Sequence, residues 1–179
     1  MNTLSPRRAG LLLALLQGGL LLSLGAVRHM DRVRLPRAWV RTAPHDPELP
    51  IRGRYVSLRL LVPAPELRSL LPLPDAQRCW QAVRLVAKGD RLEALPGAAA
   101  AASRPSQWAC VDKLDNTAMA RLDEPVAFFL PPDVDDPSQR TDGKTLWVEV
   151  TVPPEGPPRP IRLGLSAKGG GRITPLQLR

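Results

Sequence analysis

The sequence has few of the side chains on which most catalytic and metal sites depend. Its 179 residues include two histidines, two cysteines and four lysines. None of these stands at the spacing of a zinc or calcium site. Lys88 lies in an expected turn, and His29 and His45 lie where we expect no rigid fold, so a serine has no well-placed basic partner. We therefore predict a protein that is not an enzyme and has no catalytic residue, metal or cofactor.

Aromatic side chains are also scarce, at 4% of the chain, and the formal net charge of +8 is carried mainly by scattered arginines. Proteins that bind nucleic acid usually gather basic residues on one face and add aromatic rings for stacking. We therefore predict that nucleic acid is not a partner. Richness in alanine, arginine, leucine and proline is typical of a chain encoded by G+C-rich DNA. The alternative is a basic surface facing anionic lipid or an acidic partner.

What the sequence does contain is one long apolar run. Residues 9–27 carry no charged side chain and include nine leucines, with Arg7 and Arg8 before them and Arg28 after them. A helix of these 19 residues is roughly 28 Å long, close to the ~30 Å of hydrocarbon in a bilayer. We predict a tail at residues 1–8 and a transmembrane helix at 9–27, so that the lipid bilayer is one partner.

The apolar run fits both a cleaved signal peptide and an uncleaved signal anchor. Ser23 and Gly25 offer a small-x-small cleavage site, but the run exceeds the about 7–15 apolar residues of a signal peptide, so we favour the anchor. The arginines after the helix outnumber those before it, which by the positive-inside rule favours a cytoplasmic domain. We nevertheless expect a bacterial inner-membrane protein with a periplasmic C-terminal domain, because the tail is short and two cysteines suit an oxidising compartment.

Small residues recur along the predicted membrane helix. Gly10, Ala14 and Gly18 follow one another every four residues and therefore lie near one face. Small residues allow a second helix to approach closely, so we predict a helix-packing face here. The alternative is that glycine is simply common in membrane helices.

The chain after the helix divides into two expected regions. Prolines recur at positions 36, 44, 47 and 50, which predicts an extended, proline-rich stalk over residues 28–50, with the end of the helix at its start. Residues 51–179 then form a soluble, mostly β domain. Within it, a proline-led segment at 65–71 predicts one short helix.

Alternating apolar residues predict the strands of this domain. Val56, Leu58, Leu60 and Val62 share one face of the segment 52–62. The segment 145–152 is the clearest strand, with Leu146, Val148, Val150 and Val152 on one face and Trp147, Glu149 and Thr151 on the other. Further strands are expected at 79–87, 91–95, 108–113, 118–122, 126–130, 161–167 and near 173–178. Several short strands separated by turns predict a small antiparallel β sandwich or open barrel.

Cys79 and Cys110 are the two cysteines of the chain, and each lies near or within an expected strand. In an oxidising compartment such a pair predicts a disulfide. The alternative is two unpaired thiols that are buried as small apolar side chains.

The segment from His45 to Leu60 reads HDPELPIRGRYVSLRL and resembles the signature of the bacterial membrane-anchored GDYXXLXY family. Gly53, Tyr55 and Leu58 match that motif, whereas Arg54 stands in place of Asp and Leu60 in place of the second Tyr. The layout is also similar, because a membrane helix precedes the motif and a Phe-x-x-Pro segment follows it. The resemblance implies an uncharacterised membrane-anchored protein encoded beside multi-pass membrane proteins, and it supplies no catalytic residue.

These observations favour a single-pass envelope protein whose β domain is a non-catalytic binding or accessory domain for an integral, multi-pass membrane protein. Two other classes stay open. An envelope hydrolase or peptidase would need a buried Ser, His or Lys in a shared cleft. A small-ligand sensor would need a closed apolar pocket.

Overall fold

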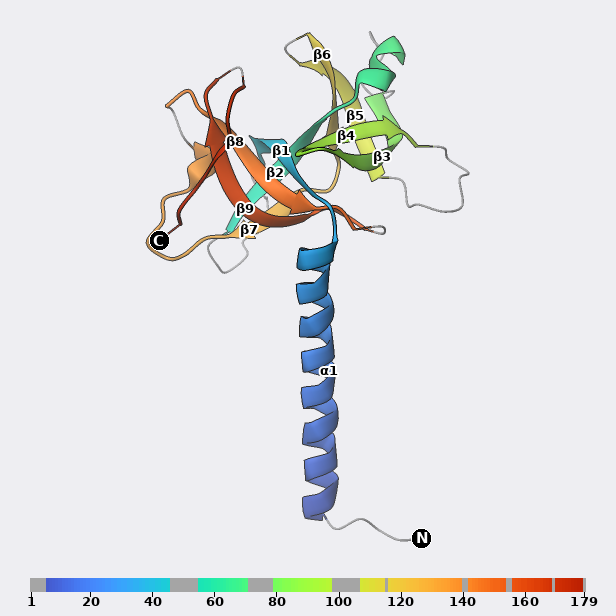
Figure 1. The fold of residues 1–179 in the computed structure, drawn as a ribbon, viewed down its shortest axis with the longest axis vertical. Coiled ribbons are helices and arrows are strands. Elements are labelled where there is room, and N and C mark those ends of the chain that lie inside the picture. Colours follow the sequence, from blue (N-terminus) through green and yellow to red (C-terminus); the bar gives the residue numbers. More distant parts are fainter. Residues whose placement is uncertain are drawn as a thin grey trace. The chain divides into compact units, whose positions relative to one another are not determined.

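The computed structural model describes residues 6–45, 55–70, 79–97, 107–114, 116–139, 142–153, 156–168 and 170–178. It separates into two compact units, Met1–Leu35 and Pro36–Arg179. The first unit contains the helix α1 (Pro6–Arg34), which begins at a proline and ends two residues before Pro36. Its stretch Ala9–Arg34 is long and apolar enough to cross a membrane, and its leucines are exposed. The predicted apolar helix over 9–27 is therefore present, and it continues over 28–34 (Figure 1).

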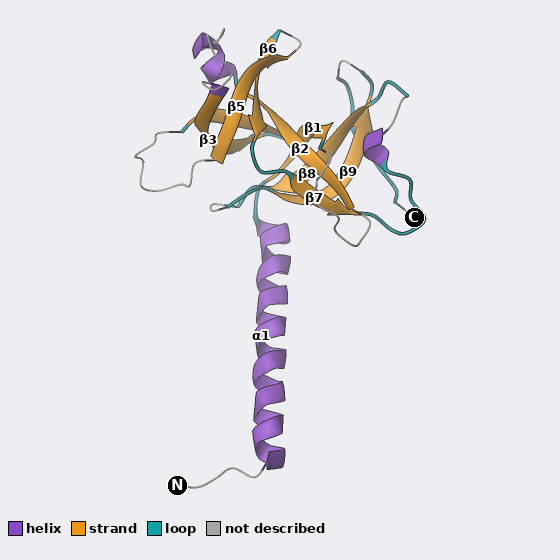
Figure 2. Ribbon diagram, turned by 180° about the vertical axis from the view of Figure 1, so that it is seen from behind, coloured by secondary structure: helices purple, strands orange, loops and turns teal. Residues whose placement is uncertain are grey.

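The second unit is built almost entirely of β strands, as predicted. Its strands are β1 (Arg37–Pro44), β2 (Tyr55–Pro63), β3 (Trp80–Lys88), β4 (Arg91–Pro96), β5 (Gln107–Leu114), β6 (Thr117–Leu122), β7 (Val126–Phe129), β8 (Thr145–Thr151), β9 (Arg159–Ser166) and β10 (Thr174–Pro175). Two short 3-10 helices, η1 (Pro65–Leu70) and η3 (Pro137–Gln139), accompany them. The helix η1 packs against β4 and β6, and η3 lies against β1; Figure 2 shows these short helices in purple.

The ten strands in the described part of the chain belong to one sheet, in the order β10-β9-β8-β1-β4-β3-β5-β6-β2-β7, and β1 also pairs with β2. That extra pairing closes a ring of β1, β4, β3, β5, β6 and β2, from which β8, β9 and β10 extend on one side and β7 on the other. Every pairing is antiparallel except the single parallel pair between β1 and β4. The architecture is thus a barrel-like curled sheet, and Figure 1 shows β3–β6 on one side of β1 and β2, with β8 and β9 on the other.

The strand β1 corrects the prediction of a proline-rich stalk over residues 28–50. It pairs with β8 over Arg37–Arg41, with β2 over Arg41–Pro44 and with β4 at Trp39, so it lies at the centre of the sheet. Ala38 and Val40 are each only 1% exposed. The β domain accordingly begins at Pro36 rather than at residue 51. Residues 46–50 of the expected stalk lie outside the described part of the chain.

One face of the curled sheet forms a single hydrophobic core. In β2 the burial alternates as the sequence predicted, with Val56, Leu58, Leu60 and Val62 all buried and their neighbours partly exposed. Burying one such side chain contributes about 1.5–3 kcal/mol relative to leaving it in water. The predicted short helix is the 3-10 helix η1, and its Leu67 is buried in the same core. Because the strands pair in this register, their buried residues lie on the same face from strand to strand and form one continuous core.

The two cysteines are joined by a disulfide, which confirms the predicted pair. Cys79 immediately precedes β3, Cys110 lies in β5, and their α-carbons are 4.6 Å apart. Cys110 is also the ladder partner of Trp80, the residue that follows Cys79. The bond therefore holds the end of the β3–β5 pairing.

We expect that replacing both Cys79 and Cys110 by Ser lowers the free energy of unfolding by roughly 4 kcal/mol, because the cross-link removes entropy from the unfolded chain. Urea unfolding of the full chain in detergent, followed by tryptophan fluorescence, measures this change. Unmodified protein with added reductant is the control and should approach the Ser variant. An unfolding midpoint that neither reductant nor substitution moves would contradict the expectation.

Candidate binding surface

All four tryptophans of the chain lie on the outward face of the sheet. Trp39 stands between Ala38 and Val40, which point into the core, and Trp147 and Trp108 precede the buried Val148 and Ala109. Trp80 belongs to the same face, because it is the ladder partner of Cys110, two residues along β5 from Trp108. Large aromatic side chains are usually well buried, so an outward face that holds every tryptophan is the most informative feature of the domain.

One part of this face is a row formed by Trp39, Glu149 and Arg162, which are ladder partners across β1, β8 and β9. Nε of Arg162 lies 2.6 Å from Oε2 of Glu149. The guanidinium of Arg162 also lies over the Trp39 ring, 5.5 Å from its centroid. The row combines a charge-assisted hydrogen bond with a cation–π contact.

The two faces of β8 alternate as the sequence predicted, and Glu149 and Thr151 on the outward face are nevertheless buried. Glu149 is only 6% exposed and Thr151 1%. Trp39 and Arg162 flank Glu149 in the sheet, and Thr151 donates its hydroxyl to the carbonyl of Arg159 at 3.5 Å. Both residues do point away from the core, but β8 has paired strands on both sides whose large side chains cover them.

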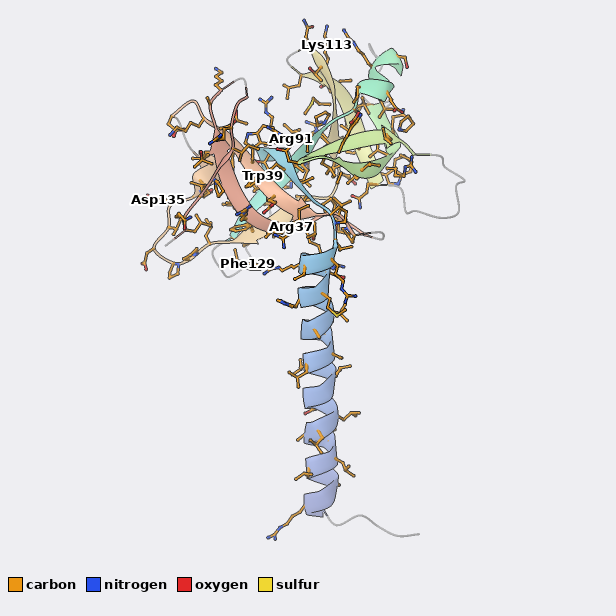
Figure 3. The ribbon with its side chains drawn as sticks, in the orientation of Figure 1. Arg37, Trp39, Arg91, Lys113, Phe129 and Asp135 are labelled. Atoms are coloured by element: carbon orange, nitrogen blue, oxygen red, sulfur yellow. A yellow bond between two sulfur atoms is a disulfide. The ribbon has the colours of Figure 1, made fainter. Side chains whose placement is uncertain are left out.

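A second contact joins strands that barely pair through their backbones. The parallel contact between β1 and β4 is limited to Trp39 and Arg91, with a hydrogen bond from the Trp39 N–H to the carbonyl of Asp90 at 2.7 Å. Arg91 lies over the Trp147 ring, 4.3 Å from its centroid, and thereby connects β4 to β8 across β1. Nε1 of Trp147 donates to Oγ of Ser166 at 2.8 Å. Figure 3 shows Trp39 and Arg91 close together at this junction.

Gly164 in β9 makes room for Trp39. A Cβ atom at this position would lie 2.8 Å from the Trp39 ring and 2.7 Å from the Ile173 side chain. No other residue could occupy the position without moving one of these neighbours. The glycine therefore permits the indole to lie close against β9.

The other two tryptophans are more open to solvent. Trp80 is 38% exposed and Trp108 is 60% exposed. They are diagonal neighbours on β3 and β5, because Trp80 pairs with Cys110 and Ala82 with Trp108. Arg84 on β3 and Arg121 on β6 are exposed on the same face, and Arg121 is the partner of Cys110. We call Trp80, Trp108, Arg84 and Arg121 the open tryptophan surface.

The residues predicted from the family motif lie elsewhere. Leu58 is fully buried in the core, and Tyr55 begins β2 with its ring 6.3 Å from that of Phe129 in β7. Gly53 lies outside the described residues. Tyr55 and Leu58 of β2 therefore have structural roles, in the core and in the pairing with β7.

The predicted helix-packing face is exposed along α1. Gly10 and Gly18 have no atom within 4 Å of an added Cβ, and Ala14 is exposed. No second helix lies against this face in the part of the chain that the structure describes, so the packing face stays a prediction. His29 on α1 is also exposed, and the backbone N–H of His45 donates to the carbonyl of Ser57 at 3.1 Å. In the described part of the chain, no group of three or more His, Cys, Asp or Glu side chains is placed to hold a metal ion.

No protein-family model matches the chain, and neither a curated protein nor a solved structure matches it.

Sequence reasoning missed the cluster around Trp39. A signal was present, because Ala38, Val40 and Thr42 alternate with larger polar or aromatic residues between Pro36 and Pro44. An isolated glycine in a strand, here Gly164, also indicates close approach by another group. The pairing of Trp39 with Arg162, however, depends on strand register and could not be read from spacing.

We expect Arg162→Leu to lower the free energy of unfolding by about 2 kcal/mol, because it leaves the buried Glu149 carboxylate without its partner. Arg84→Leu, which removes an exposed arginine on the same outward face, should change it by less than about 0.5 kcal/mol. Replacing both Glu149 and Arg162 by Leu should recover part of the loss. Urea unfolding of the full chain measures all three, and equal effects of the two arginine substitutions would show that the ion pair contributes nothing.

Proposed function

We propose that the protein is a single-pass membrane protein whose β domain is a non-catalytic accessory domain that binds an integral membrane protein. The observation that carries this proposal is the outward position of all four tryptophans, two of them open to solvent beside exposed arginines. Tryptophan and arginine are the residue types most enriched at the energetic centres of protein interfaces. We assign the open tryptophan surface to the partner.

Chain length supports a partner in the same membrane. Eight residues, 28–35, separate the last apolar residue of the membrane segment from Pro36, where the β domain begins. Eight residues span at most roughly 28 Å even when fully extended. The domain therefore stays close to the bilayer surface and meets membrane proteins at high local concentration. The face of Gly10, Ala14 and Gly18 offers the same partner a second contact within the bilayer.

We also propose that the chain is a divergent relative of the GDYXXLXY family. The support comes from what the motif residues do here. Tyr55 and Leu58 pair with Phe129 and Val126 of β7, so the motif strand and the Phe-rich segment that follows it hold each other in the sheet. A structural role of this kind agrees with a motif that supplies no catalytic residue.

The proposed location is the bacterial inner membrane, with the β domain in the periplasm. The disulfide between Cys79 and Cys110 supports an oxidising compartment. The arginines that follow the helix argue for the opposite orientation, so location is a direct test of the proposal.

We expect a C-terminal alkaline phosphatase fusion to be active in bacterial cells, because that enzyme acquires its own disulfides only outside the cytoplasm. A C-terminal fusion to a fluorescent protein that matures only in the cytoplasm should stay dark. Fluorescence without phosphatase activity would place the domain in the cytoplasm and overturn the proposed location.

Photo-crosslinking in native membranes tests the proposed partner. With a photoreactive amino acid in place of Trp108, we expect one predominant adduct with an integral membrane protein. The same probe at Thr117, an exposed position on β6, is the matched control and should give little. Adduct yield should fall when Arg121→Glu reverses a charge on the open tryptophan surface, and when Gly18→Ile fills the predicted helix face without preventing insertion.

The opposite results would overturn the accessory-domain proposal. These are equal yields at Trp108 and Thr117, adducts with soluble proteins only, or a yield that neither Arg121→Glu nor Gly18→Ile changes. A Gly18→Ile effect alone would keep the membrane partner and remove the open tryptophan surface from the interface.

A further inference from the structure

A pocket of about 330 Å³ opens at the end of the sheet where β1 finishes, β8 begins and β9 ends. Its walls come from four separate segments, namely β1, η3, the turn before β8 and the turn after β9. The pocket lies away from the open tryptophan surface, which β3, β5 and β6 carry. Its volume is at the lower end of the range for small-molecule sites.

Three basic side chains line this pocket, one from each of three segments: Arg41 from β1, Lys144 from the turn before β8, and Lys168 from the turn after β9. None of the lining residues that the structure describes is acidic. Two acids adjoin the lining residues in sequence, and one of them pairs with a lysine of the pocket. Asp142 pairs with Lys144 at 3.6 Å, and the carboxylate of Asp136 accepts the backbone N–H of Ser138 at 2.8 Å.

Hydroxyl groups complete the polar lining. Ser138 and Thr145 line the pocket beside the three cations. The Thr42 hydroxyl donates to the carbonyl of Leu146 at 3.1 Å, so it also binds β1 to β8 at the base of the pocket. Leu146 and Leu165 contribute the apolar part of the wall.

We propose that this pocket binds the phosphate group of a small ligand. A guanidinium, two ammonium groups and two hydroxyls are the donors that phosphate oxygens take in protein sites. A pocket of this volume leaves space for a small polar group attached to the phosphate. The same chemistry would come from a soluble phosphate ester or from the headgroup of an anionic lipid, and the two sources differ in how the phosphate reaches the pocket.

The test uses the full-length protein in two settings at low salt. In a neutral detergent, inorganic phosphate and glycerol phosphate are titrated while tryptophan fluorescence or calorimetry reports binding. In nanodiscs, phosphatidylglycerol is compared with phosphatidylcholine as the surrounding lipid. Binding in detergent assigns a soluble phosphate, and binding only in phosphatidylglycerol discs assigns a lipid headgroup.

The variant that decides the proposal is Lys144→Gln combined with Lys168→Gln, which should weaken binding at least about tenfold in whichever setting shows it. Lys113→Gln removes an exposed lysine on β5 outside the pocket and should leave binding unchanged. Both variants should keep the unfolding transition of the parent protein. No binding in either setting, or equal binding by the two variants, would overturn the phosphate site. Neither outcome bears on the membrane partner, because the open tryptophan surface is untouched.

Discussion

The pairing of β1 with three different strands is the constraint on which the rest of the domain depends. β1 joins β8 through one edge and β4 and β2 through the other, so the ring and its extension meet at this strand. Its inward side chains are small, with Ala38 and Val40 fully buried. β1 and β4 share a single ladder pair, so backbone pairing alone would join these two strands weakly. The stacking of Arg91 on Trp147 strengthens this junction on the outward face of the sheet.

The core and the outward face of the sheet differ in the residue types that they hold. Leucine, valine and alanine fill the interior of the curled sheet, and every tryptophan belongs to the opposite face. Trp39 and Trp147 are used there to cover the junction between strands, and arginines lie on both rings. Trp80 and Trp108 have no such role in the described contacts. That difference separates a part of the outward face that stabilises the fold from a part that is available for binding.

The sequence predicted those features that depend on local pattern. The alternation in β2 and β8, the proline-led η1 and the cysteine pair each followed from residues within one segment or from residue counts. β1 was missed because Pro36 and Pro44 suggested an extended stalk, while a strand can begin and end at proline when its interior N–H groups stay free to pair. The arginine–tryptophan contacts and the basic pocket combine residues from distant segments. Such sets depend on register, which spacing along the chain does not reveal.

The pairing of β1 with β8 also determines when the domain can form during synthesis. Arg37 pairs with Thr151 and Arg41 with Trp147. The first strand to be synthesised therefore cannot complete its pairing until one of the last strands has been made. Contacts between such distant segments make folding slow, because a long loop must close before they form. Until β8 has left the ribosome, the edge of β1 that pairs with β8 stays open, and β1 directly follows a helix that is long and apolar enough to cross a membrane. Early insertion of that helix would keep nascent chains apart at the bilayer surface and limit edge-to-edge aggregation.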